Sequence, residues 1–182
     1  MLLLLMVLSS TASLRAEEAE RPARMDRAYW YQGQIVVTVL PEANEGYIQF
    51  ARRVLANPER QAEVALFNRN KAIQRDRALH VPLLLLKLPL RGAALRMLYS
   101  EDELTERGWS HHVTDPLENL IALTEAYTGT KARYRELAQY NRLKNPDALR
   151  LGTEIVVPLH WIPEALGFGP RSIREPLVLE KD

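Results

Sequence analysis

The chain has 182 residues, no cysteine, and 24 basic against 23 acidic side chains, which leaves a formal net charge of +1. This length is enough for one ordinary domain or two small ones. The absence of cysteine excludes disulfides, thiolate nucleophiles, cysteine-ligated zinc and lipid attachment at a cysteine. The near-neutral charge argues against a nucleic-acid scaffold, and neither glycine-rich phosphate-binding pattern occurs.

The N-terminus resembles a secretory signal. Its first eight residues are all apolar, and small polar residues follow, with suitable cleavage positions after Ala12 or Ala16. The apolar run is shorter than the roughly 20 residues of a membrane-spanning helix, so we expect no stable transmembrane span. We therefore predict a signal peptide at 1–16, a flexible leader at 17–28, and export to the periplasm or cell wall.

The chain contains an internal repeat. At an offset of 73 residues, two helical stripes coincide, each with apolar spacing i, i+3, i+4 and i+7. The stripes are Tyr47, Phe50, Ala51 and Val54 in the first copy and Leu120, Leu123, Thr124 and Tyr127 in the second. The same offset places Asn68 on Asn141, at the end of a second predicted helix. Two helices are therefore expected in each copy.

Each helix pair is flanked by predicted strands. The β-branched run 35–40 precedes the first pair, and the alternating run 109–114 precedes the second. Apolar runs that end in proline, 86–89 and 155–158, close the copies, since proline is tolerated at strand ends. Their offset of 69 implies four extra residues in the loop of the first copy. The predicted fold class is α+β, with two tandem βααβ units joined by a short helical linker.

The segment between the copies also carries helix signals. Ser100 and Glu103 have the spacing of a capping box, and Gly108 can end the helix that they begin. After the second copy, three prolines and scattered charges are typical of a tail without a core of its own. The predicted order is a first unit at 29–90, the helical linker at 91–108, a second unit at 109–160 and a tail at 161–182.

The second copy resembles a lysin motif (LysM) domain, a small carbohydrate-binding module. The resemblance covers about 46 residues and rests on an ordered set of short segments. They are Pro116–Leu120, Tyr127 with Gly129, Leu137–Asn141, Asn145–Asp147, Leu149–Gly152 and Ile155–Pro158. The first copy resembles a degenerate member of the same family, with the helix stripes and Asn68 but no Asn-Pro in its long loop.

The resemblance implies non-catalytic binding of glycans that contain N-acetylglucosamine, such as peptidoglycan or chitin. The family binds them in a shallow groove between the loop before the first helix and the loop before the last strand. Mapped onto the second copy, the implied glycan-binding residues are Leu117, Glu118, Asn119, Leu120, Asn145, Pro146, Asp147, Leu149, Arg150 and Leu151. The expected role is anchoring or recruitment at the cell envelope, with a cell-wall hydrolase as a candidate partner.

Several residues also have purely structural interpretations. Asn119 stands where an N-cap would satisfy the N–H groups of the first helical turn, and we favour that interpretation. Asn68 and Asn141 stand at helix ends, where asparagine more often caps than binds a ligand. A metal site at His111 and His112 is disfavoured, because neighbouring strand residues point to opposite faces.

No enzyme activity, cofactor or metal is expected, since two binding units leave only a linker and a tail, too little to enclose a substrate cleft. The alternative function is a protein-docking module of an envelope assembly, with the LysM fold but little sugar affinity. Leucines at 83 and 117, where the family usually has glycine, favour this alternative. Its docking surface would be the leucine run 83–86 or the region of Trp161.

Overall fold

The computed structural model describes residues 23–169. The predicted signal peptide at 1–16, the first part of the predicted leader and residues 170–182 of the predicted tail lie outside this range. Helices and antiparallel sheets both form within it, so the α+β class is confirmed. None of the helices described for residues 23–169 has the length and apolarity that crossing a lipid bilayer requires.

Two three-stranded antiparallel sheets organise the chain. The first sheet has the order β1-β2-β3, with β1 at Met25–Tyr31, β2 at Gln34–Val39 and β3 at Leu79–Pro82. The second has the order β4-β5-β6, with β4 at Glu103–Thr105, β5 at Gly108–His112 and β6 at Glu154–Val157. Since β1 starts at Met25, the leader ends earlier than the predicted residue 28.

A tight hairpin joins β1 to β2. Tyr31 pairs with Gln34, and the two residues between them, Gln32 and Gly33, have φ angles of 49° and 74°. Two positive φ angles in a two-residue loop define the turn whose twist matches that of the paired strands. The sequence signals placed β2 and β5 correctly, but the strand that precedes each of them in the sheet was not foreseen.

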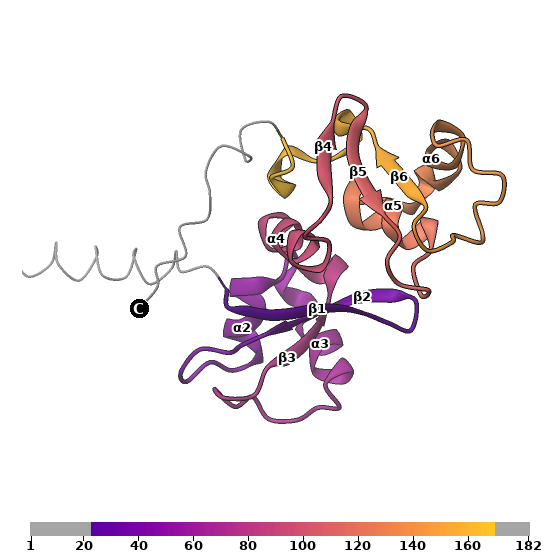
Figure 1. The fold of residues 1–182 in the computed structure, drawn as a ribbon. Coiled ribbons are helices and arrows are strands. Elements are labelled where there is room, and N and C mark those ends of the chain that lie inside the picture. Colours follow the sequence, from indigo (N-terminus) through magenta and orange to yellow (C-terminus); the bar gives the residue numbers. More distant parts are fainter. Residues whose placement is uncertain (1–22, 170–182) are drawn as a thin grey trace, which may run out of the picture.

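A pair of helices lies between the second and third strands of each sheet (Figure 1). The first pair is α2 at Tyr47–Val54 and α3 at Gln61–Phe67, and the second is α5 at Leu120–Thr128 and α6 at Tyr134–Tyr140. The stripes that the sequence indicates are the ones that pack. Phe50, Ala51 and Val54 are buried on α2, and all four stripe residues of α5 are buried.

The strand that closes the first sheet is not the predicted run 86–89. It is β3, and Leu88 and Pro89 instead begin a helix, α4 at Leu88–Leu98, which Figure 1 shows between the two units. Proline is accepted in the first turn of a helix as readily as at a strand end. An apolar run that ends in proline therefore does not distinguish a closing strand from the start of a helix. The loop before the third strand is consequently shorter in the first unit, at 68–78, than in the second, at 141–153.

The predicted helical linker is helical only up to Leu98. Residues 103–105 form β4, where Glu103 pairs with Ser110, and Gly108 begins β5 instead of ending a helix. The local capping signal is overridden, because strand pairing satisfies the same backbone groups within the sheet.

The part of the predicted tail that the structure describes belongs to the core. Leu166 and Phe168 are 0% and 2% exposed, and the short 3-10 turn at Glu164–Leu166 packs on α4. A Cβ atom on Gly92 of α4 would collide with the Leu166 carbonyl oxygen, so this contact requires glycine. Arg96 donates hydrogen bonds to the carbonyls of Leu166 and Gly167, which fastens the turn.

The two units share one hydrophobic core. Tyr99 directly follows α4, and its hydroxyl accepts a hydrogen bond from the indole nitrogen of Trp30 in β1 over 2.8 Å. The Tyr99 ring in turn lies against His111 of β5, with ring centroids 4.2 Å apart. The second unit is therefore positioned through the end of α4.

Candidate functional site

The two loops that were predicted to form a groove lie together at one end of the second sheet. Val113, directly after β5, donates its N–H to the Thr153 carbonyl over 3.0 Å and accepts the N–H of Gly152 over 2.7 Å. These bonds continue the pairing of β5 with β6 beyond the ends of both strands. They hold the loop 114–119 beside the end of the loop 141–153.

Glu118 organises the first of these loops from inside. One of its carboxylate oxygens accepts the backbone N–H groups of Thr114 and Asp115, over 2.9 and 2.8 Å, and also the Thr114 hydroxyl. The other oxygen lies 2.6 Å from His111 Nε2. The Glu118 side chain is 0% exposed. Its carboxylate faces the protein, so the side chain of this implied glycan-binding residue is not open to a glycan.

His111 lies between two carboxylates in the interior. Its Nδ1 is 3.0 Å from both oxygens of Asp102, and the Tyr127 hydroxyl donates to the same carboxylate over 2.8 Å. Burial by itself lowers the pKa of His111, but hydrogen bonds and charge from Asp102 and Glu118 outweigh it and raise this pKa to about 9. The ring is therefore an imidazolium at neutral pH, and both of its nitrogens donate.

Because both ring nitrogens are occupied, His111 does not act as a metal ligand. His112 is exposed while His111 is buried, as expected for adjacent strand residues. Within residues 23–169, no group of three or more histidine, aspartate or glutamate side chains is placed to hold a metal ion. The chemistry of the His111 cluster is structural: it ties the loop 114–118 to β5 through charge-assisted hydrogen bonds.

Asn119 is the N-cap of α5, as predicted. Its side-chain oxygen accepts the N–H of Ala122 over 2.8 Å, and its backbone is extended, with φ −138° and ψ 149°. Leu120, the next residue, is 1% exposed, so its side chain belongs to the core. Leu117 differs from both, because its side chain is 53% exposed while its N–H is bonded to the Asp115 carboxylate.

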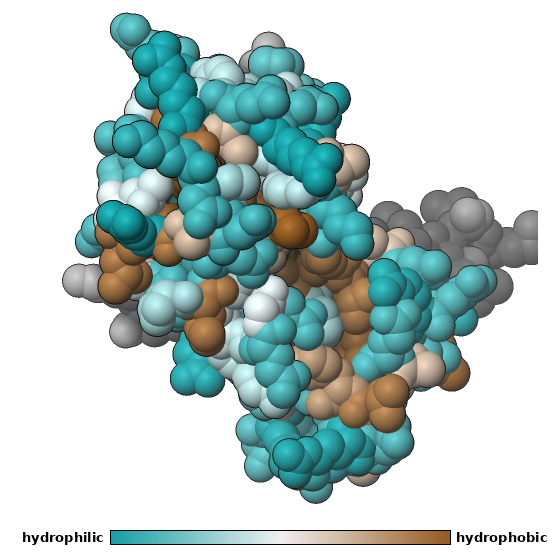
Figure 2. Space-filling model, turned by 90° about the vertical axis from the view of Figure 1, so that its right-hand side faces the viewer, coloured by the Kyte–Doolittle hydropathy of each residue, from teal (hydrophilic) through white to brown (hydrophobic). Residues whose placement is uncertain are grey.

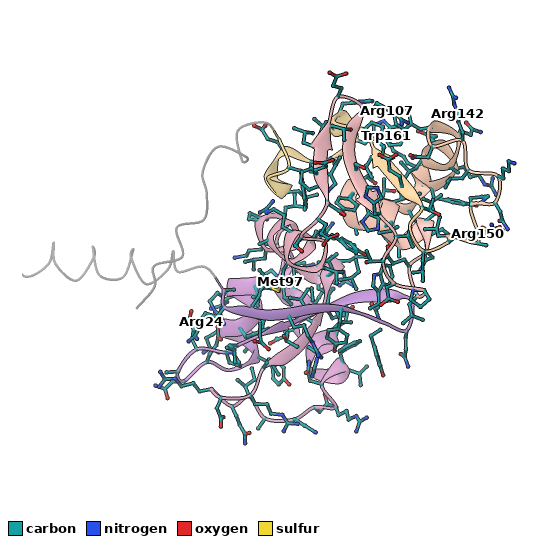
Figure 3. All side chains as sticks on the ribbon, in the orientation of Figure 1. Arg24, Met97, Arg107, Arg142, Arg150 and Trp161 are labelled. Atoms are coloured by element: carbon teal, nitrogen blue, oxygen red, sulfur yellow. The ribbon has the colours of Figure 1, made fainter. Side chains whose placement is uncertain are left out.

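Most side chains of the second loop are exposed, including Arg142, Lys144 and Asn145. The Asn145 side chain accepts the N–H of Asp147 over 3.1 Å, which makes the predicted turn around Pro146. Leu149 is partly buried against the core, and Leu151 is 63% exposed. Figure 3 places Arg150 on the outer side of this loop. Of the implied glycan-binding residues, those with exposed side chains are Leu117, Asn145, Asp147, Arg150 and Leu151.

The first unit contains counterparts of the groups that organise the second. Glu45, which precedes Glu118 by 73 positions, accepts the N–H of Glu42 over 2.8 Å, but its ionic partner is Arg53, at 2.6 Å, instead of a histidine. The equivalence of these two carboxylates was not predicted from the sequence. The offset of 73 residues could have identified Glu45 and Glu118 as equivalent, since each precedes the first helix of its unit.

Asn68 and Asn141 make the same three hydrogen bonds. Each amide nitrogen donates to the carbonyl four residues earlier, Val64 or Leu137, and to a carbonyl of the third strand. Each amide oxygen accepts the backbone N–H of that same strand residue. Both asparagines are therefore structural, as the sequence favoured, and they connect the second helix of each pair to the third strand.

The surfaces considered for protein docking differ in accessibility. In the leucine run 83–86, only Leu84 is exposed. A small hollow of about 190 Å³ between the units includes Leu84 and Ala122, and Figure 2 shows hydrophobic side chains gathered around a hollow on one face. Trp161 lies with Arg107 at the end of the second unit (Figure 3), where the Tyr140 ring is 6.3 Å from Trp161.

No protein-family model, curated protein or solved structure matches this chain.

Proposed function

We propose that the protein is exported to the cell envelope and that its second unit binds glycans containing N-acetylglucosamine, such as peptidoglycan, without catalysis. In this proposal both units are βααβ bodies of the LysM type, each preceded by an additional strand. The second is the glycan-binding copy, and the first is a degenerate, mainly structural copy. The protein would anchor itself, or a partner such as a cell-wall hydrolase, at the glycan.

The observation that carries the proposal is the backbone pairing of Val113 with Gly152 and Thr153. It brings together two loops that are separated by the whole helix pair. It also leaves Leu117 and Leu151, one on each loop, with more than half of their side-chain surface exposed. Loops that a rigid scaffold positions often carry binding residues.

The chemistry of these loops suits an acetylated amino sugar. An acetamido group offers one N–H donor, one carbonyl acceptor and a methyl group. Exposed loop backbone pairs with the first two, and leucine side chains pack against the third. No ionised group has to take part, which is consistent with the inward orientation of Glu118. Binding at one shallow site is expected to be weak, about −4 to −8 kcal/mol.

The tandem arrangement is supported by paired structural roles. Asn68 and Asn141 make equivalent hydrogen bonds, and Glu45 and Glu118 each anchor the loop before a first helix. Repeated side-chain roles at a constant offset are what a duplicated unit predicts. If the first unit retained a weak contact, a polymeric glycan would bind more tightly than a short one through effective concentration.

The test is co-sedimentation of the chain with insoluble peptidoglycan and with chitin. The variant Leu117→Ser with Leu151→Ser is expected to remain in the supernatant severalfold more than the unchanged protein. Leu66→Ser is the matched control, because Leu66 is 71% exposed on α3 of the first unit. Circular dichroism of all three proteins should show equal folding. A folded, unchanged protein that stays in the supernatant with both polymers would reject glycan binding in favour of the docking function.

A further inference from the structure

The first unit contains a pocket that lies apart from the loops of the proposed glycan site. Its volume is about 450 Å³, which falls within the roughly 300–1,000 Å³ that is typical of small-molecule sites. The lining comes from β1 and the hairpin turn after it, from the end of α3 and the loop that follows, and from β3. The pocket therefore uses the additional strand of the sheet, which the LysM resemblance does not include.

Positive charge surrounds this pocket. Arg69, Lys71 and Arg77 line it, and no aspartate or glutamate is among the described residues that do so. In the part of the chain that the structure describes, none of the three cations forms an ion pair. By contrast, Arg53 in the same unit is paired with Glu45. The cations of the pocket are therefore available to an anionic group of a ligand.

Aromatic rings supply the apolar part of the lining. Tyr31 is 45% exposed, and its ring meets that of Phe67 edge to face, with centroids 6.2 Å apart. Tyr29 also lines the pocket, and its hydroxyl is hydrogen-bonded to His80 Nδ1 over 2.8 Å. A tyrosine side chain has an apolar ring and a polar hydroxyl, so it packs well against a cyclic ligand that also carries polar groups.

The pKa of His80 reflects the positive charge around the pocket. Burial lowers the pKa of this histidine, and the positive charges of Arg27 and Arg77 lower it further. Arg27 itself stacks on the Tyr29 ring, 4.6 Å from its centroid. The imidazole therefore experiences an excess of positive charge.

We propose that this pocket binds a small cyclic molecule that carries a phosphate or carboxylate group. The anion is held by Lys71 and Arg77, with Arg69 beside them, and the ring of the ligand packs on Tyr31 and Phe67. This site is independent of glycan binding by the second unit: an uncharged chito-oligosaccharide lacks the anion, and the residues of the two sites do not overlap.

The experiment uses three probes, glucose 6-phosphate, glucose and inorganic phosphate, added to the isotope-labelled protein and followed by NMR. Glucose 6-phosphate is expected to shift the amide signals of residues 69–80 and to bind at least about tenfold more tightly than glucose or inorganic phosphate. It should also raise the pKa of His80, measured from the ring protons, because a bound anion stabilises the imidazolium. The loops at 114–119 and 141–153 should not respond.

Two variants separate the charge from the rings. Lys71→Gln with Arg77→Gln should weaken binding of glucose 6-phosphate by about tenfold or more, whereas Tyr31→Ser should weaken it while leaving binding of inorganic phosphate unchanged. Arg24→Gln is the control for loss of positive charge away from the pocket, since this arginine precedes β1 and does not line the pocket (Figure 3). All four substituted side chains are exposed, so folding should be preserved.

Three results would overturn the proposal. The first is the absence of any shift at residues 69–80 with glucose 6-phosphate. The second is equal affinity for inorganic phosphate and glucose 6-phosphate, which would remove the role of the rings. The third is an equal loss of binding in the Arg24 control, which would reduce the effect to net charge. Failure of co-sedimentation with peptidoglycan would leave this site unaffected, so the two proposals fail separately.

Discussion

His111 Nε2 lies 2.6 Å from Glu118 Oε2, and neither side chain is exposed to solvent. The bond connects β5 with the loop that precedes α5, and it sets the position of Leu117 and Asn119 on that loop. Because Asp102 occupies the other ring nitrogen, one imidazolium lies between two carboxylates. Buried charges of this kind are stable only while all partners are present.

Glu118→Gln should therefore be strongly destabilising. The amide keeps the size of the side chain but removes the charge that His111 faces and weakens the acceptor for the N–H groups of Thr114 and Asp115. We expect a loss of about 3 kcal/mol in the free energy of unfolding, measured by urea denaturation. Glu106→Gln, in the exposed turn between β4 and β5, is the control and should stay within about 0.5 kcal/mol. Equal stabilities for the two variants would contradict the structural role of Glu118.

Stability should fall as the pH rises above neutrality. The pKa of His111 is about 9 in the folded protein against an ordinary value of 6.5, so the folded state binds this proton more tightly than the unfolded state does. The resulting stabilisation, of the order of 3 kcal/mol, is complete below about pH 6.5 and is lost as the pH passes through about 9. Urea denaturation at a series of pH values measures it.

The same profile has an acidic limb from Glu118. Burial opposes its ionisation, but hydrogen bonds from His111 and from the backbone N–H groups of Thr114 and Asp115 hold the pKa of Glu118 below its ordinary value. Its stabilisation is present above pH 4.5 and is lost as the pH falls through the folded pKa.

The variant His111→Gln should flatten the alkaline limb. An alkaline limb of unchanged slope in that variant would assign the titration to another group.

The paired asparagines give a test of equivalent roles in the two units. Asn68→Ala and Asn141→Ala each remove three hydrogen bonds and leave strand groups of β3 or β6 without their partner. Each should cost about 2–3 kcal/mol of unfolding free energy. Asn145→Ala, which loses a single bond in an exposed turn, should cost about 0.5–1 kcal/mol. If either buried-bond variant were as stable as Asn145→Ala, its network would be of little energetic importance.

Phe168 should matter for stability although it lies near the end of the described chain. Its ring packs on Trp109 and Tyr127, with centroids 4.5 and 5.6 Å away, and the Arg96 guanidinium lies over it. Phe168→Ala is expected to lower the unfolding free energy by about 3–5 kcal/mol, seen as a reduced Tm in calorimetry. Leu66→Ala, at a side chain that is 71% exposed, should leave the Tm nearly unchanged. An unchanged Tm for Phe168→Ala would mean that the segment after Trp161 is dispensable for folding.

Local periodicity predicted the parts of the fold that one stretch of sequence specifies. The helix α2 is amphipathic on its own, and the stripe of α5 recurs at the offset of 73 residues. Asn119 caps the helix that follows it without help from distant residues. The closing strand of the first unit was misplaced, because residues 79–90 are apolar almost throughout and their period is uninformative. The strand β4 was hidden by a capping pattern that its partner β5 overrides.

The sequence by itself determined the α+β class, the two helix pairs and the constant offset between them. Only the tertiary structure decided that Glu118 turns inward, that Phe168 completes a core beside Trp109, and that Arg69, Lys71 and Arg77 surround an aromatic pocket. The physical reason is range. Helical stripes and caps depend on residues three or four positions apart, whereas buried ion pairs and pockets depend on chain segments that meet only after folding.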